Sequence, residues 1–294
     1  MINKKFFHSI TATLIFTLSF QFTTLGQSSK SFYELSTLNN YAPVENDFNF
    51  WNDFNNGIDD FGNYFTSPLH FSKNTWVKIG GVTAIAGLSF FADNSVRTAV
   101  SKNHSTFQDN LVKIGDNYGK GIIPVGLAVG LYGIGFFTNN YEIKSTGQIL
   151  FESLAAAGIT VTALKVIIGR SRPYIEQGNH NFSPFNTDND YNSLPSGHVI
   201  VAFTTSTVLA EKIENIYASI ALYGLATLTA YQRIYSDNHW FSDTFLGAVL
   251  GVAIGKYFVH LDNKRLDHNE SKLSYHLSPN LINGGLGMNF SLTF

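Results

Sequence analysis

Six apolar stretches between Trp76 and Leu261 limit what this chain can fold into more than any other feature of its sequence. They cover residues 77–92, 121–137, 149–168, 198–210, 216–231 and 243–261. Small residues recur within them at spacings of three and four, which suits close packing of helices. Only 14% of the residues are charged, against about 25% in ordinary globular chains. We therefore expect an all-α fold, a six-helix bundle with extensive buried or lipid-facing surface.

The segments that flank this helical region differ from it in composition. Residues 1–26 carry lysines, an apolar run and small residues ahead of Gln27, which is typical of a cleaved export signal; an uncleaved membrane anchor is the alternative. The Asn, Asp and Phe residues that follow predict a polar, aromatic-rich N-terminal extension. The tail alternates polar and apolar residues around Asn283-Gly284-Gly285, which indicates a β-hairpin. The expected domains are a signal peptide (1–26), an N-terminal extension (27–72), a helical domain (73–262) and a tail with a short C-terminal β-hairpin (263–294).

The charge and cysteine content exclude several classes of protein. The formal net charge is -2, so the chain offers no basic surface for nucleic acid. It contains no cysteine, which excludes a disulfide framework and a lipid-modified cysteine. An exported chain without cysteine fits a bacterial envelope protein.

A first polar cluster ends the third apolar stretch. Lys165 and Arg172 are seven residues apart, so on a continuous helix they share one face. Pro173 helps to end that helix, because proline disfavours helical conformation in the residue before it. Arg170 is either a third cation of the same site or a solvated neighbour. The alternative for the whole cluster is a set of cations that snorkel at a membrane edge.

A second cluster is the sequence Leu-Pro-Ser-Gly-His at 194–198, directly before an apolar run. Pro195 and Ser196 indicate a helix start, and Gly197 lets the backbone approach a ligand closely. The free N–H groups of a first helical turn form an anion site, and His198 is in position to contact the same anion. The alternative is an ordinary capped helix with an incidental histidine.

A third cluster contains Arg233, His239 and Asp243. If a helix begins near His239, then His239 and Asp243 share a face, and the carboxylate can hold one imidazole nitrogen. A nucleophilic histidine oriented by a carboxylate is one arrangement of covalent catalysis. The alternative is a surface His–Asp pair.

Together the clusters supply the groups that phosphoryl transfer needs. Cations and backbone amides stabilise the charge that develops on the equatorial oxygens of a transferring phosphoryl group. One histidine can attack phosphorus while the other protonates the leaving oxygen. None of the clusters has the ligand spacing of a zinc or magnesium site, so we expect no metal and no cofactor.

The three clusters resemble the signature of the type 2 phosphatidic acid phosphatase and vanadium haloperoxidase superfamily, which reads K-x6-R-P, P-S-G-H and S-R-x5-H-x3-D. The first part matches Lys165 and Arg172-Pro173, the second matches Pro195 to His198, and the third matches Arg233, His239 and Asp243. The resemblance covers residues 76–261. Gln232 replaces the serine of the family signature, so we expect a changed hydrogen bond beside the site and unchanged chemistry.

This resemblance implies a fold and a role for each motif residue. It implies an α-helical bundle with the site at the ends of its core helices. His239 is implied as the nucleophile that forms a phosphohistidine, Asp243 as its orienting group and His198 as the general acid. The implied phosphate-binding residues are Lys165, Arg172, Ser196, Gly197 and Arg233. The phosphatases of this superfamily need no metal.

The leading functional prediction is a metal-independent histidine phosphatase that acts on an envelope lipid phosphate or diphosphate. Undecaprenyl diphosphate, phosphatidylglycerol phosphate, phosphatidate and a lipid A phosphate are the substrates considered. A soluble broad-specificity periplasmic acid phosphatase, a vanadium haloperoxidase and a non-enzymatic envelope protein are the alternatives.

We expect the site to face the periplasm. A membrane-embedded form is favoured over a soluble periplasmic one, because residues 121–137 are free of charge and unusually apolar. The expected partners are the phosphate substrate and the membrane, and the oligomeric state stays open.

Overall fold

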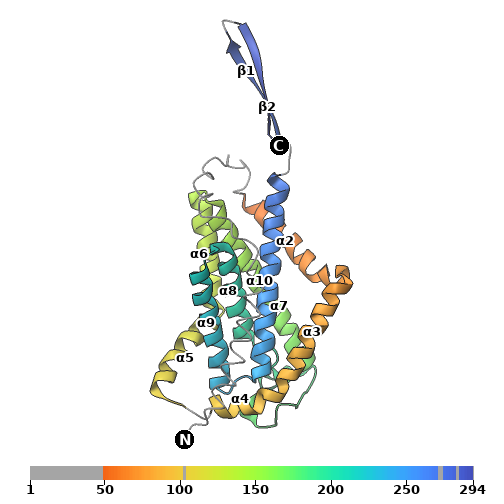
Figure 1. Ribbon diagram of the computed structural model, residues 1–294, viewed down its shortest axis with the longest axis vertical. Coiled ribbons are helices and arrows are strands. Elements are labelled where there is room, and N and C mark those ends of the chain that lie inside the picture. The colour runs from red at the N-terminus through yellow and green to blue at the C-terminus, as the bar shows by residue number, and fades with distance from the viewer. Residues whose placement is uncertain (1–48, 102–103, 271–273, 283–284, 294) are drawn as a thin grey trace. The chain divides into compact units, whose positions relative to one another are not determined.

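The computed structural model describes residues 49–101, 104–270, 274–282 and 285–293 (Figure 1). The predicted signal peptide, residues 1–26, lies outside the described residues. So do most of the predicted N-terminal extension and the turn residues 283–284 of the predicted hairpin.

The described residues form nine α-helices and two strands. The helices are α2 (Phe50–Thr66), α3 (Lys73–Ser89), α4 (Asp93–Val100), α5 (Thr106–Gly119), α6 (Ile122–Thr138), α7 (Tyr141–Ile168), α8 (Gly197–Ile213), α9 (Ile216–Tyr235) and α10 (Phe241–Glu270). The strands are β1 (Ser274–Ile282) and β2 (Gly285–Thr293), which pair antiparallel with Ser274 opposite Thr293.

The helical region is all-α as predicted, but the six-helix count is not confirmed. The six apolar stretches fall on α3, α6, α7, α8, α9 and α10. Three further helices, α2, α4 and α5, lie in segments without a long apolar run. In α2 the apolar residues Phe50, Phe54, Phe61 and Phe65 recur at helical spacings. The many Asn and Asp residues between them make the segment polar in composition, so composition does not indicate this helix.

The core of the bundle is formed where α7, α8 and α10 pack together. Ala156 and Ala157 of α7 and Ile200 of α8 are fully buried there beside Phe258 of α10. A Cβ atom added at Gly251 of α10 would lie 2.7 Å from the backbone oxygen of Ile200, so the close approach of α8 and α10 requires glycine. The small residues seen in the sequence therefore set the helix spacing.

Helix α2, which belongs to the predicted extension, is joined to the bundle by ion pairs as well as by aromatic packing. Lys144 Nζ lies 2.9 Å from Asp53 Oδ1, and Arg265 Nη2 lies 2.5 Å from Asp60 Oδ2. The ring of Phe61 packs edge-on against Phe258 at a centroid distance of 6.0 Å. Residues 50–66 of the predicted extension therefore pack against the bundle.

Several described helices have the length and composition of membrane-spanning segments. Three segments qualify individually: Lys73–Val100, Tyr141–Ile168 and Phe241–Leu266. Helices α5 and α6 pass the same test together and are bent by 51° at the break between them. These features are those of a membrane protein.

Candidate active site

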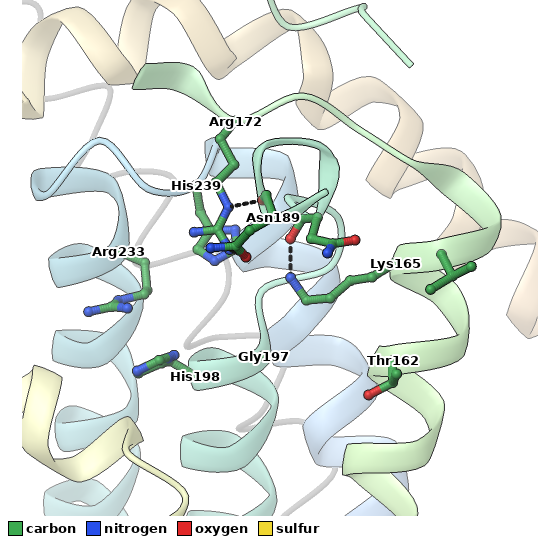
Figure 2. A pocket seen from close by; sticks show the side chains of 10 residues that line it. Thr162, Lys165, Arg172, Asn189, Gly197, His198, Arg233 and His239 are labelled. Carbon is green, nitrogen blue, oxygen red and sulfur yellow. Dashed lines mark hydrogen bonds between the residues drawn. The ribbon is translucent and has the colours of Figure 1, made fainter. Parts of the chain in front are cut away.

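A pocket of about 350 Å³ lies where the C-terminal ends of α7 and α9 meet the N-terminal ends of α8 and α10 (Figure 2). It is lined by Thr162, Lys165, Val166, Arg172, Asn189, Asn192, Gly197, His198, Arg233 and His239. The structure thus brings residues from all three sequence clusters to one place. Of the predicted site residues, Ser196 and Asp243 are fully buried and lie outside this lining.

The prediction that Lys165 and Arg172 share one helix face was wrong. Helix α7 ends at Ile168, and Gly169 turns the chain with a left-handed backbone at φ 62°. A Cβ atom added at Gly169 would lie 1.8 Å from the backbone oxygen of Ser183. The glycine turn, and not Pro173, ends the helix. Lys165 and Arg172 therefore reach the pocket from a helix and from the loop after it.

Two asparagines in the loop before α8 hold these two cations, although neither belongs to the three sequence clusters. Lys165 Nζ donates a hydrogen bond to the backbone oxygen of Asn192. Arg172 donates from Nε to the backbone oxygen of Asn189 and from Nη2 to its Oδ1, each at 2.9 Å (Figure 2). The Asn- and Asp-rich run at 186–192 was the available signal, because such residues favour tight turns whose carbonyls point outward.

Helix α8 begins as the second cluster predicts. Ser196 is the residue before the first helical residue, Gly197, and its N–H donates to the backbone oxygen of Asp243 at 3.1 Å. The Oγ of Ser196 is buried and has no hydrogen-bond partner among the described residues. Gly197 and His198 thus line the pocket, while Ser196 connects the start of α8 to α10.

His198 is held in a tight environment. A Cβ atom added at Gly119 of α5 would lie 3.1 Å from the Cβ of His198 and 2.5 Å from Cγ2 of Thr229. Burial lowers the pKa of His198 to about 4, and the charge of Arg233 acts in the same direction. Without a bound anion, the imidazole of His198 is therefore neutral at neutral pH.

Arg233 is oriented by two neighbours. Its Nη2 donates to Asp116 of α5, and its Nε donates to the side-chain oxygen of Gln232. Gln232 therefore forms a hydrogen bond to the arginine beside it, at the position where the family signature has serine. The N–H of His239 donates to the backbone oxygen of Arg233 at 3.2 Å, which connects the two pocket residues of the third cluster.

His239 and Asp243 lie close together at the start of α10. The Nδ1 of His239 is 3.6 Å from Oδ2 of Asp243, which is longer than a hydrogen bond. Helix α10 begins at Phe241, two residues after His239, and Asp243 Oδ2 accepts from the N–H of Trp240 at 2.8 Å. Asp243 therefore caps the helix on which it lies, as in a capping box.

Burial controls the protonation of His239. It lowers the pKa of this imidazole to about 3, against an opposite effect of Asp243. The neutral ring retains a nitrogen lone pair, which a nucleophile needs. The arrangement can therefore support attack on an anion bound between the three cations.

Arg170 occupies neither of the two positions that the sequence left open. It is fully buried, lies outside the pocket lining and contacts Asp243 from behind. It is thus neither a third cation of the pocket nor a solvated neighbour.

Within the part of the chain that the structure describes, no group of three or more His, Asp or Glu side chains is placed to hold a metal ion.

Comparison with known proteins gives one curated relative and two solved structures. The chain is 26% identical over 237 residues to the lipid A 1-phosphatase of Porphyromonas gingivalis, an alignment that covers 79% of this chain and 44% of that protein. The chain therefore spans less than half the length of this relative.

The two solved structures have limited similarity to this fold. The crystal structure of Aquifex aeolicus LpxE has a TM-score of 0.45 at 22% identity, covering 57% of this chain and 94% of that one. The first transmembrane PAP2 type phosphatidylglycerolphosphate phosphatase from Bacillus subtilis has a TM-score of 0.46 at 17% identity, covering 71% and 96%.

The family comparison covers the part of the chain that carries the three clusters. The sequence profile of the PAP2 superfamily matches residues 147–267, a range that includes every predicted site residue. Residues 147–267 therefore match the PAP2 superfamily, in agreement with the resemblance that the three motifs showed.

Proposed function

We propose that this protein is a metal-independent phosphatase that removes a phosphate group from an envelope lipid through a phosphohistidine intermediate. The observation that carries the proposal is the pocket itself. Two neutral histidines and the cations Lys165, Arg172 and Arg233 line one cavity of about 350 Å³.

The cations and the start of α8 serve as the phosphate-binding groups. Lys165, Arg172 and Arg233 supply N–H donors and positive charge, and the backbone N–H groups of the first turn from Gly197 onward add further donors. Ser196 holds this turn in place from behind, since its N–H donates to the backbone oxygen of Asp243 and its side chain is buried. Such groups stabilise a transition state best when they are already in place before the reaction.

The two histidines divide the chemistry between them. The ring nitrogen of His239 that faces away from Asp243 attacks phosphorus, and the bond to the leaving oxygen breaks. His198, which takes up a proton when the phosphate group binds beside it, gives that proton to the leaving oxygen. Water then attacks the phosphohistidine while His198 takes up a proton, which restores both groups. Asp243 stabilises the positive charge that His239 gains in the first step.

A lipid substrate is supported by the surface next to the pocket. An apolar groove of about 570 Å³ runs along α7, lined by Ala155, Gly158, Ile159, Thr162 and Ala163. Thr162 lines both the groove and the phosphate pocket, so a hydrocarbon chain on α7 adjoins the phosphate site. The relative named lipid A 1-phosphatase makes a lipid A phosphate the first substrate to test.

We also propose that the site faces the periplasm. The export signal predicted at residues 1–26 and the candidate spans at Lys73–Val100, Tyr141–Ile168 and Phe241–Leu266 support a chain that is exported to the envelope and held in the membrane.

The function is tested by phosphate release from the purified protein in detergent, with EDTA present throughout. The panel contains a lipid A phosphate, phosphatidylglycerol phosphate, phosphatidate, undecaprenyl diphosphate and p-nitrophenyl phosphate. Release from lipids that is lost in His239→Ala supports the proposal. Release from the soluble ester alone favours an acid phosphatase, vanadate-dependent bromide oxidation favours a haloperoxidase, and no turnover at all refutes the enzyme.

A further inference from the structure

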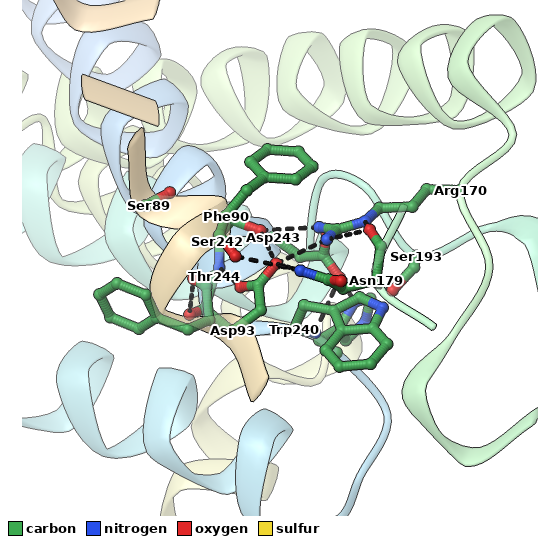
Figure 3. A network of polar contacts seen from close by, with 12 residues as sticks. Ser89, Phe90, Asp93, Arg170, Asn179, Ser193, Trp240, Ser242, Asp243 and Thr244 are labelled. Atoms are coloured by element: carbon green, nitrogen blue, oxygen red, sulfur yellow. Dashed lines mark hydrogen bonds and ion pairs between the residues drawn. The ribbon is translucent and has the colours of Figure 1, made fainter. Parts of the chain in front are cut away.

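Arg170 is enclosed by protein on all sides behind the pocket. Its side chain has no exposed surface. Its guanidinium carbon lies 4.1 Å from the ring centroid of Phe90 and 5.6 Å from the ring of Trp240 (Figure 3). A guanidinium removed from water in this way is stable only when its charge and its donors are matched.

The protein matches every donor of Arg170. A guanidinium has five N–H groups. Nη1 donates to Ser242 Oγ at 2.7 Å and to Asp243 Oδ1 at 2.5 Å. Nη2 donates to Asp93 Oδ2 at 2.6 Å and to the backbone oxygen of Asn179 at 2.7 Å, and Nε donates to the same oxygen at 3.1 Å. These bonds use all five N–H groups and leave none for a phosphate.

Arg170 and two other donors fix the carboxylate of Asp243. Its Oδ1 accepts from Arg170, and its Oδ2 accepts from Ser193 Oγ at 2.5 Å and from the N–H of Trp240 at 2.8 Å. The groups around this carboxylate are donors, which favours its ionised form. The orientation of Asp243 toward His239 therefore depends on Arg170.

Asp93 of α4 completes the network from a distant part of the chain. Its Oδ1 accepts from the N–H of Ser242 at 2.8 Å, and its Oδ2 accepts from Ser242 Oγ at 2.8 Å and from Arg170 (Figure 3). Asp93 thus accepts from an N–H in the first turn of α10 that has no partner within the helix. It also binds the guanidinium of Arg170, which in turn binds Asp243. One carboxylate secures both the helix that carries Asp243 and the arginine that orients it.

We propose that Arg170 and Asp93 are positioning residues for catalysis, which act on His239 through Asp243. The inference rests on the proposed function. Two carboxylates and one guanidinium leave one negative charge beside His239. This charge stabilises the positive charge that the imidazole gains as it attacks phosphorus, and the network holds Asp243 where that stabilisation is strongest.

The test compares Asp93→Asn, Arg170→Lys and their double variant with wild type, using p-nitrophenyl phosphate as substrate and inorganic phosphate as inhibitor. Each single change should lower kcat about 10²-fold, because a small misplacement of a reacting group has that cost. The Ki of phosphate should stay unchanged. The kcat of the double variant should fall no further than that of the more impaired single variant, since the effects of residues that act as a unit are not additive. Arg172→Lys, which alters a pocket cation, should instead raise the Ki of phosphate.

A second measurement is independent of turnover. In protein labelled with ¹⁵N-histidine, the His239 ring signals, assigned with His239→Gln, should show an Nδ1–H tautomer in wild type. They should shift toward a mixture of tautomers in Asp93→Asn and Arg170→Lys. If wild type hydrolyses no ester, the proposed function fails and this measurement alone decides the positioning role.

Two results would overturn the inference. The first is a rise in phosphate Ki equal to that of Arg172→Lys, which would make Arg170 a phosphate ligand. The second is a lower melting temperature with wild-type kcat per folded protein and wild-type ¹⁵N shifts, which would make the network purely structural. Ser242→Ala removes one hydroxyl of the same network and serves where the charge variants do not fold; it should show the same changes at smaller size.

Discussion

Binding of an anion in the pocket should draw a proton onto His198. In the empty pocket, burial and the neighbouring charges of Arg233, Lys120 and Lys165 hold the pKa of His198 down at about 4. A dianion between these cations offsets their charge and places negative charge beside the imidazole. Both effects favour the protonated ring, which is the form that a general acid needs.

The size of this effect follows from the pKa of the empty site. At pH 6, two pH units above a pKa of about 4, roughly one His198 in a hundred carries the proton. An opposite charge at contact distance raises the pKa of a base by about 1 to 3, which places His198 between about 5 and 7 in the complex. Binding at pH 6 should therefore take up roughly 0.1 to 0.9 protons.

Isothermal titration calorimetry with sulfate measures this uptake directly. Sulfate stays a dianion across the range, so its own titration does not contribute. The heat of binding at pH 6 is recorded in buffers with different ionisation enthalpies, and the slope gives the number of protons. His198→Asn should remove most of the uptake and leave only the smaller share of His239, whose pKa in the empty site is lower, about 3. His70→Gln, at an exposed position, should leave the uptake unchanged. Sulfate binding without proton uptake in wild type, or with the same uptake in His198→Asn, would refute the reasoning.

Three further predictions address the nucleophile, the general acid and the turn after α7. His239→Ala should abolish turnover in a folded protein, and acid-labile phosphate on histidine should be trapped in wild type only; turnover within tenfold of wild type contradicts the assignment. His198→Ala should lose about 10²–10⁴-fold on a lipid monophosphate and much less on an aryl phosphate, whose leaving group needs no proton; equal losses mean that His198 only shapes the pocket. Gly169→Ala should destabilise by more than the ~1–2 kcal/mol of a left-handed backbone, because its Cβ meets Ser183. Gly178→Ala, at φ 86° in open space, is the control in denaturant unfolding, and equal losses would show that the contact has no effect.

The helices that position the site could be predicted, whereas those that support it could not. Helices α7 to α10 are long apolar segments, and an apolar run of that length has few alternatives to a helix. Helix α5 carries Asp116, which orients Arg233, but its sequence alternates polar and apolar residues without a continuous run. Its closeness to the site depends on Gly119, and a single glycine in a sequence does not reveal which neighbour it approaches.

The position of Arg170 shows a second reason why part of the site could not be predicted from the sequence. The sequence left Arg170 open as a third cation or a solvated neighbour, and the left-handed Gly169 directs the chain away from the helical path that was predicted for Lys165 and Arg172. Its partner Asp93 lies 77 residues earlier in the chain, so no local pattern connects the two charges. An arginine in a motif can therefore be assigned to the ligand or to the scaffold only when its donors are counted in three dimensions.

The way in which the pocket cations are held explains how they stay available for a phosphate. Lys165 and Arg172 are fixed by neutral oxygens of Asn192 and Asn189, which orient the two groups without cancelling their charge. Among the residues that the structure describes, Arg233 is the one pocket cation that pairs with a carboxylate, that of Asp116, and Lys120 lies 2.7 Å from the same carboxylate. The pocket therefore retains net positive charge on donors that are already in position. Electrostatic stabilisation of a transition state requires this combination, because donors that must first reorient lose most of their effect.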